Sequence, residues 1–146
     1  MPTTKTRKKS KTHGVRWWKK KAWDEFSKYI RKRDALKNED TGMYFKCCTC
    51  GKVYPAFGKG CGQAGHYVAG RKNSYLFEEH GCHAQCYNCN INLKGNTILY
   101  RKFMIETYGL EETERIEQLF FVNKEYRIWD LEEIYNKYKE KLGSME

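Results

Sequence analysis

Two pairs of cysteines are the residues of this sequence best suited to bind a metal. Cys47 and Cys50 form one C-x2-C pair, and Cys86 and Cys89 form a second, with 35 residues between the pairs. Each tight turn points two thiolates at one ion, and four thiolates form a tetrahedral zinc set. A redox motif is the alternative for a single pair, but two pairs in polar surroundings favour a structural zinc site.

Three further cysteines complete the seven of the chain. Cys48 is too close to Cys50 to share a metal with it in good geometry, and Cys61, between two glycines, could be a ligand in a rival assignment. Cys82 is expected to be a small buried residue. A disulfide framework is disfavoured, because the opening MPTTKTRKKSK has no secretory-signal character.

A histidine and an amide near the cysteine pairs could carry hydrolytic chemistry. A strand ending at His66, a second strand through His83 and a helix opened by Cys86-x-x-Cys89-Asn90 have the order of a ββα-metal, HNH-type nuclease. In such a site a neutral His66 takes a proton from water. A hard cation, Mg²⁺ or Mn²⁺, stabilises charge on the phosphate, and Asn90 fits as its oxygen ligand.

The sequence departs from that pattern at Gly65, where many HNH sites place a metal-binding Asp directly before the base. His83 is our first candidate to replace that carboxylate, followed by Glu78 and Glu79. Gly81 stands where many such sites have an Asn and can adopt the same positive φ. The plainer alternatives are that His66 is a satisfied polar residue and that His83 caps the cysteine turn. His13 and His80 are expected to be exposed.

Positive charge is concentrated at the N-terminal end. The chain has a net charge of +10, and residues 1–21 hold nine Lys or Arg and no acid. A basic arm of this kind most often binds nucleic acid, because each neutralised phosphate releases counterions. A solubilising or targeting tail is the alternative. The predicted phosphate contacts are two groups, one near the site and one on the first helix: Arg71, Lys72 and Lys94, and Arg31, Lys32 and Arg33.

The elements around the site follow from hydrophobic periodicity. Trp18, Ala22, Phe26 and Ile30 recur at helical spacing, which predicts a helix over Val15–Asn38. The Gly- and Cys-rich middle predicts short β pieces at Met43–Lys46, His66–Val68 and Tyr75–Phe77. Helices are expected over Ile98–Tyr108, with Gly109 as C-cap, over Glu111–Val122, and from Asp130 onward, with Asp130 as the cap.

Composition and pattern together predict an α+β protein with a small zinc-stapled ββα-metal, HNH-like unit. The expected organisation is a disordered basic tail (1–14), an N-terminal basic amphipathic helix (15–40), the zinc-bound nuclease unit (41–96) and a C-terminal helical region (97–146). At 40% apolar residues, with no apolar run near the ~20 that span a bilayer, a transmembrane protein is excluded. A cytoplasmic location is therefore expected.

At these residues the chain resembles the phage NinG family, the lambda-type Rap recombination proteins. The matching segments include Gly65–Ser74 (GHYVAGRKNS), Leu76–Asn90 (LFEEHGCHAQCYNCN) and Leu93–Gly109 (LKGNTILYRKFMIETYG), with CTCGK near Cys47. The family commonly shows N-x-H-x-Q-C; this chain has Gly81 but keeps His83, Gln85 and Cys86. The resemblance covers roughly residues 17–142.

The resemblance implies a phage or prophage endonuclease that cleaves branched recombination intermediates, Holliday junctions or D-loops, in the host-cell cytoplasm. Other recombination proteins are expected partners. Two coordinated cuts would suit a homodimer, and Leu119, Phe120 and Phe121 form an apolar patch for one, although a core role is the stronger expectation for them. The alternatives are a non-catalytic zinc module that binds DNA or RNA, and an accessory factor that recruits partners through its acidic C-terminal helices.

Overall fold

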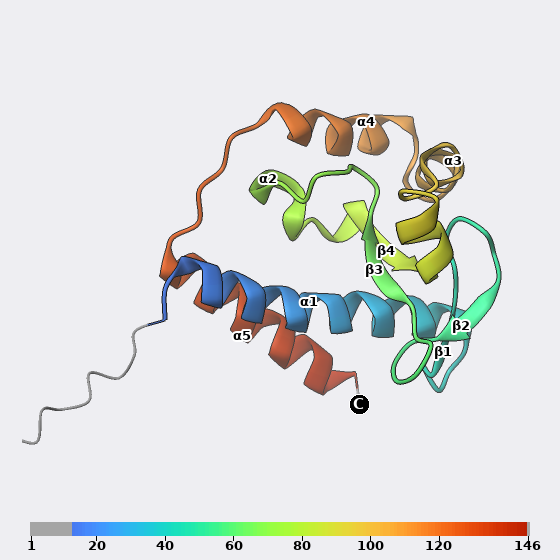
Figure 1. Cartoon of the computed structure of the whole chain (residues 1–146), viewed down its shortest axis with the longest axis horizontal. Helices are drawn as coiled ribbons and strands as arrows, with labels where there is room; N and C mark the ends of the chain where they lie inside the picture. The colour runs from blue at the N-terminus through green and yellow to red at the C-terminus, as the bar shows by residue number, and fades with distance from the viewer. Residues whose placement is uncertain (1–12, 146) are drawn as a thin grey trace, which may run out of the picture.

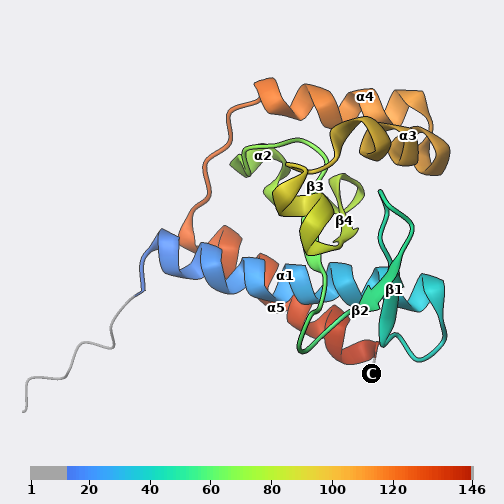
Figure 2. The same cartoon turned by 45° about the vertical axis from the view of Figure 1, so that its right-hand side comes forward.

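The computed structural model describes residues 13–145. Most of the expected basic tail therefore lies outside the described residues. Two long helices, α1 (Val15–Asn38) and α5 (Ile128–Ser144), lie side by side along one edge of the molecule, although they come from opposite ends of the described chain (Figures 1 and 2). The middle of the chain folds on top of α1, so this helix is the platform for the site.

The periodicity of α1 explains its packing. Ala22, Phe26 and Ile30 lie four residues apart on one face and are fully buried, whereas Lys20, Lys21 and Lys28 are exposed. Phe26 meets Tyr138 of α5 edge to face, with 4.9 Å between ring centroids. The helix contains no Gly or Pro, and its expected bounds match the observed ones.

Two short antiparallel hairpins form the β structure. In the first, β1 (Tyr44–Lys46) pairs with β2 (Val53–Pro55). In the second, β3 (Gln63–His66) pairs with β4 (Cys82–Gln85), with Gly65 opposite His83 and His66 opposite Cys82. Because side chains alternate along a strand, His66 and Gly65 face opposite sides of this hairpin. Ala64 and Cys82 pack against α1, in the same core cluster as Phe26 of that helix.

Several local expectations for the middle region were wrong. Tyr75–Phe77 was expected as a strand, but the short helix α2 (Asn73–Leu76) occupies most of that segment, followed by a 3₁₀ turn (Glu79–Gly81) before β4. The strand expected over His66–Val68 overlaps the observed β3 only at His66. Cys89 lies within a five-residue π-helical turn (Asn88–Asn92). Lys94, Gly95 and Asn96 then all take positive φ, which separates this turn from the next helix.

The C-terminal half is helical, as expected, with α3 (Thr97–Tyr108) and α4 (Leu110–Gln118) folded across β3 and β4 (Figure 2). Gly109 ends α3 with a φ of 88°. Asp130 is not the cap of α5: the helix begins at Ile128, and the Asp130 carboxylate accepts a hydrogen bond from the Arg127 backbone at 2.9 Å. The fold is thus a mixture of helices and two small sheets. No helix among residues 13–145 is long and apolar enough to cross a membrane.

The apolar run after α4 has little core role. Leu119 packs partly into the core near Tyr67 and Met104. Phe120 and Phe121 lie in a 3₁₀ turn (Leu119–Phe121) and are 39% and 75% exposed. The core role that we expected for these three residues therefore holds only for Leu119.

Candidate functional site

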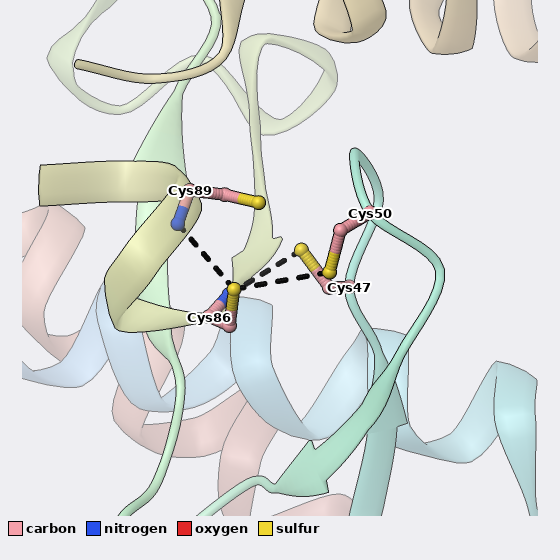
Figure 3. Close-up of side chains that lie close together, drawn as sticks. All are labelled: Cys47, Cys50, Cys86 and Cys89. Carbon is pink, nitrogen blue, oxygen red and sulfur yellow. Dashed lines mark hydrogen bonds between the residues drawn. The ribbon is translucent and has the colours of Figure 1, made fainter. Parts of the chain in front are cut away.

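Four cysteines from two separate parts of the chain converge on one point. Cys47 and Cys50 come from the turn after β1, and Cys86 and Cys89 come from the end of β4 and the π-helical turn (Figure 3). Their sulfur atoms all lie within 4.8 Å of one another, and Cys50 Sγ is 3.9 Å from Cys86 Sγ. A tetrahedral ion with Zn–S bonds of about 2.3 Å needs sulfur atoms about 3.8 Å apart. The cluster therefore fits a structural metal such as zinc.

Polar neighbours prepare these sulfur atoms to carry negative charge. The backbone N–H of Cys86 donates to Cys47 Sγ at 3.4 Å, the Thr49 hydroxyl lies 3.4 Å from the same sulfur, and Asn96 Nδ2 donates to Cys89 Sγ at 3.6 Å. Burial opposes ionisation of Cys47, but hydrogen bonds from backbone N–H groups and from the Thr49 hydroxyl outweigh it and lower the pKa of Cys47 to about 6. Donors of this kind orient metal ligands and tune their charge.

Four thiolates this close together repel one another, so all four cysteines can be ionised only if a cation lies between them. Burial and, to a smaller extent, the neighbouring Cys47 raise the pKa of Cys50 to about 12. The pKa of Cys89 is also raised, chiefly by burial. A divalent ion at the centre removes this repulsion, because a coordinated thiol is deprotonated outright.

The other three cysteines lie outside the cluster. Cys48 packs beside the core of Tyr67, Tyr100 and Met104, and Cys82 is fully buried. Cys61 Sγ lies 3.6 Å from Arg31 Nη1. The rival assignment of Cys61 as a ligand is wrong, because the metal-competent set within the described residues is Cys47, Cys50, Cys86 and Cys89.

His66 sits at the end of β3 in a defined aromatic setting. Its Nε2 is 3.0 Å from the Leu76 carbonyl oxygen, and its ring stacks on Trp23 of α1 with centroids 5.1 Å apart. A carbonyl oxygen only accepts, so Nε2 carries the proton and Nδ1 keeps a free lone pair. Burial and, to a smaller extent, the charge of Arg71 lower the pKa of His66 to about 4, although the Leu76 hydrogen bond acts in the opposite direction.

Because Gly65 has no side chain, it leaves a space on the face of the hairpin opposite to His66, which we call the hollow at Gly65, and Gln85 Oε1 occupies it. A Cβ at Gly65 would lie 2.0 Å from Gln85 Oε1 and 3.1 Å from Asn90 Oδ1. The side chain of Gln85 thus fills the space that residue 65 would otherwise use. Asn90 donates from Nδ2 to Gln63 Oε1 at 2.7 Å, which leaves its own oxygen directed at the hollow. Amide oxygens of this type are ligands for hard cations.

His83 does not replace the missing carboxylate. It is 1% exposed, its Nδ1 lies 3.1 Å from the Tyr100 hydroxyl, and its Nε2 lies 2.7 Å from the Tyr108 hydroxyl. Tyr100 in turn donates to the Gly65 carbonyl at 2.6 Å. Both ring nitrogens are therefore used in a buried chain that fixes the backbone of Gly65. Burial also lowers the pKa of His83 well below its usual value.

Glu78 and Glu79 are also held elsewhere. Glu78 pairs with Arg115 at 3.0 Å. Glu79 accepts from Tyr29 at 2.7 Å, from Tyr138 at 3.1 Å and from Lys141 at 3.4 Å, so it ties α1 to α5. Neither carboxylate belongs to the hollow at Gly65, and the expectation that one of them replaces an Asp ligand was wrong.

Basic and aromatic side chains line two adjoining pockets beside this site. One is lined by Arg16, Lys19, Lys20, Trp23, Arg71 and Leu76, and the other by residues that include Trp23, Arg31, Gln63, Arg71 and Asn90. Trp23 and Arg71 belong to both pockets, and the Arg71 guanidinium lies 4.3 Å from the centre of the Trp23 ring. The pockets place positive charge next to Asn90 and to the stack over His66.

The basic residues predicted to contact phosphates differ in exposure and in the partners that they already have. Arg71, Lys72 and Lys94 are exposed, although Lys72 Nζ donates to the Phe120 carbonyl at 3.2 Å. Arg33 is buried in polar contacts: it donates to the carbonyls of Glu79 at 2.8 Å and Cys82 at 2.7 Å. Its role as a DNA contact was therefore wrong, since its guanidinium braces the turn before β4.

The two neighbours of Arg33 on α1 are partly engaged. Arg31 Nη1 donates to the Ala56 carbonyl at 2.9 Å, although the residue still lines the pocket with Asn90. Lys32 Nζ donates to the Thr41 carbonyl at 3.4 Å. The cluster Arg31-Lys32-Arg33 is therefore no single basic surface, because three consecutive helix positions point in three directions.

Sequence reasoning missed several residues that the structure places at the site. Gln85 was named only as part of a motif, and Gln63 and Trp23 were not considered for the site. Arg16, Lys19 and Lys20 were counted as charge but not linked to Arg71. The helical spacing of Arg16, Lys19, Lys20 and Trp23 on one side of α1 was the available signal.

Comparison with known proteins identifies the family. The family model described as Bacteriophage Lambda NinG protein matches residues 3–146. The chain belongs to the NinG family. The NinG proteins of Escherichia phage 933W and Salmonella phage P22 are each 32% identical to it over 133 residues, and that of Escherichia phage lambda is 31% identical over the same length.

The NinG relatives are longer than this chain. Each alignment covers 88% of the chain but only 57–58% of these relatives, so the chain spans somewhat over half of their length. No solved structure matches it. The family resemblance noted in the sequence is thus confirmed.

Proposed function

We propose that this NinG-family chain is a metal-dependent endonuclease that cleaves branched DNA, such as Holliday junctions and D-loops, during phage recombination. The observation that supports this most directly is the state of His66. Its Nε2–H is committed to the Leu76 carbonyl, so the free lone pair is on Nδ1. With a pKa of about 4, the ring is neutral at physiological pH and can accept a proton.

The proposed reaction is hydrolysis of one phosphodiester bond. Water attacks the phosphorus and its proton passes to His66 Nδ1. The bond to the 3′ oxygen breaks, and that oxygen takes a proton from solvent water, which leaves 5′-phosphate and 3′-hydroxyl ends. Arg71 and Arg31 line the pocket beside Asn90 and supply the positive charge that would hold the phosphate. A bound Mg²⁺ or Mn²⁺ would stabilise negative charge on the phosphate and on the leaving oxygen, and Asn90 Oδ1 is the residue we assign to hold it.

The layout around His66 also supports an HNH-like interpretation. A hairpin, β3–β4, runs into a helical turn that carries the last zinc-type cysteine and Asn90. The cysteine cluster fixes that turn against β1, and basic side chains from α1 extend from Arg16 towards Arg71. Phosphate contacts position nucleic acid without reading sequence, which suits an enzyme that recognises branch shape.

The deciding experiment is cleavage of a synthetic four-way junction, compared with matched duplex, by zinc-loaded protein with Mg²⁺, Mn²⁺ or brief EDTA treatment. His66→Ala should reduce cleavage by about 10²–10⁴-fold and leave junction binding within about twofold of the parent. His80→Ala is the matched control, since His80 is exposed and lies outside the site. Equal cleavage by His66→Ala and the parent would refute the assignment of the base.

A second candidate function is a zinc-stabilised DNA-binding factor without catalytic activity. Gly65 favours it, because the residue before His66 supplies no carboxylate to hold a cation. Tight junction binding without cutting under any metal would identify this function instead.

A further inference from the structure

The hollow at Gly65 contains a buried oxygen for which the protein provides no donor. Among residues 13–145, Gln85 Oε1 is the buried side-chain oxygen or nitrogen that lacks any hydrogen-bond partner. Gln85 itself is fully buried. Buried polar atoms are almost always paired, so such an atom calls for an explanation.

The orientation of the Gln85 amide is fixed by its other end. Nε2 donates to the Gly95 carbonyl at 3.0 Å and to the Thr49 hydroxyl oxygen at 3.1 Å. The Gly95 carbonyl can only accept, so the nitrogen must occupy that side and the oxygen must face Gly65. The Thr49 hydroxyl also contacts Cys47 Sγ, so Gln85 is anchored to the four-cysteine cluster.

Asn90 brings a second oxygen to the same place. Because its Nδ2 donates to Gln63, Oδ1 faces the hollow, 3.1 Å from the point where a Cβ of Gly65 would stand. Gln85 Oε1 is 2.0 Å from that point. Two carbonyl-type oxygens that face one place without a donor repel each other, and a cation or a water molecule relieves the repulsion.

We propose that Gln85 Oε1 and Asn90 Oδ1 are joint ligands of the divalent cation, and that Gln85 takes the place of the carboxylate that Gly65 cannot supply. This inference rests on the proposed nuclease function. It explains why residue 65 is glycine: any side chain there would collide with the Gln85 amide. Two neutral ligands leave the full charge of the ion available to phosphate oxygens, and they bind the free ion weakly.

The ligand assignment can be tested without measuring cleavage. The probes are Mg²⁺ added to zinc-loaded, ¹⁵N-labelled protein, followed by NMR of the side-chain amides, and Mn²⁺ added to the same protein, followed by EPR of free Mn²⁺. Because Mg²⁺ is diamagnetic, it does not cause the long-range broadening that Mn²⁺ causes, and the amide signals of Gln85 and Asn90 should shift more than that of the exposed Asn92. If the signals of all three residues shift equally, or none shifts at millimolar Mg²⁺, the assignment is overturned.

Two variants test whether the Gln85 amide supplies the metal ligand that residue 65 lacks. Gln85→Ala should weaken Mn²⁺ binding by about tenfold or more, whereas the control Asn92→Ala should not change it. The double variant Gly65→Asp with Gln85→Ala has both the space and a carboxylate, so it should bind Mn²⁺ at least as tightly as the parent. Zinc content and circular dichroism verify that each variant is folded.

The outcomes separate this inference from the proposed function. If Gln85→Ala is folded and binds Mn²⁺ as the parent does, Gln85 is not a ligand, even if the parent cleaves junctions. If the double variant does not recover binding, the exchange of positions is wrong. If Mn²⁺ binds as described but no junction is cut, the ligand assignment stands and the nuclease proposal fails.

Discussion

The four-cysteine cluster and the proposed oxygen site lie on the same few residues of chain. Cys86 directly follows Gln85, and Asn90 directly follows Cys89, yet the cysteines converge on one another and the amide oxygens face the hollow at Gly65. The sulfur atoms receive hydrogen bonds from Thr49, Asn96 and backbone N–H groups. Gln85 Oε1 receives none.

This difference indicates a division of labour. A charged, hydrogen-bonded thiolate set binds its ion tightly enough to be part of the fold. A neutral pair of oxygens binds weakly and leaves its ion free to exchange and to meet a phosphate.

The largest effect should follow from loss of a cluster cysteine. Cys86→Ser should abolish stoichiometric zinc and unfold the hairpin region, because structural zinc contributes about 10–16 kcal/mol in small zinc-finger peptides. Zinc analysis and thermal melting by circular dichroism measure this. The matched control is Cys61→Ser, which lies outside the cluster and should keep zinc and most of its stability. A Cys86→Ser protein with full zinc content and the parent melting temperature would show that the cluster is not structural.

A smaller effect is expected from a single methyl group at the oxygen site. The added Cβ of Gly65→Ala meets Gln85 Oε1 at 2.0 Å, so the variant should lose about 1–3 kcal/mol of stability by overpacking. Gly143→Ala is the control: it lies in α5, and its Cβ would meet no atom within 4 Å. This substitution should be neutral or stabilising by up to ~1 kcal/mol. Urea unfolding of both variants measures the contrast, which fails if Gly65→Ala is as stable as Gly143→Ala.

Removal of the weakly bound cation should affect stability less. Mg²⁺ at ten times its dissociation constant adds only about 1.4 kcal/mol to the free energy of unfolding. Brief treatment with a weak chelator should thus lower the melting temperature slightly and leave zinc in place, whereas extraction of zinc should unfold the chain. Melting curves with parallel zinc analysis test this. Equal losses on removal of either ion would abolish the distinction between the two sites.

The pH dependence gives the finest test, because it isolates His66. The folded pKa of about 4 lies below the usual value of about 6.5. Between these values the unfolded chain binds more protons, so the stability due to His66 is complete above pH 6.5 and is lost as the pH falls towards 4. Between pH 7 and 5 the melting temperature of the parent should therefore fall more than that of His66→Ala. Any loss of stability caused by weaker zinc binding at low pH affects both proteins and cancels in the comparison.

The rate of the proposed cleavage should depend on the protonation state of His66. The rate of the chemical step should stay level as the pH falls from 8 to about 5.5 and should halve near the folded pKa of about 4. Single-turnover cleavage across this range measures it. A half-maximal rate near 6.5, the value of an unperturbed histidine, would show that Trp23 and the hairpin do not keep His66 neutral.

Patterns of neighbouring residues were sufficient to predict part of the fold and each half of the four-cysteine cluster. The C-x2-C spacing places two sulfur atoms on one tight turn, so each half of the cluster follows from a few adjacent residues. The helical spacing of Ala22, Phe26 and Ile30 predicts α1 with its buried face. Family membership was also evident from motifs around the second cysteine pair. In each case the determining residues lie close together in the chain.

The finer assignments depended on partners distant in sequence. His83 and Gln85 lie two residues apart on the same face of β4, yet Tyr100 and Tyr108 enclose His83, and Thr49 and Gly95 orient Gln85. Arg33 differs from its neighbour Arg31 for the same reason: carbonyls of residues 79 and 82 hold its guanidinium.

The sequence by itself therefore determined which residue types are present and which cysteines can share an ion. Only the tertiary structure decided which polar side chains already have partners and which oxygen is left free to bind. The physical reason is that hydrogen-bond saturation depends on every neighbour of a group, and for buried groups most of those neighbours come from other parts of the chain.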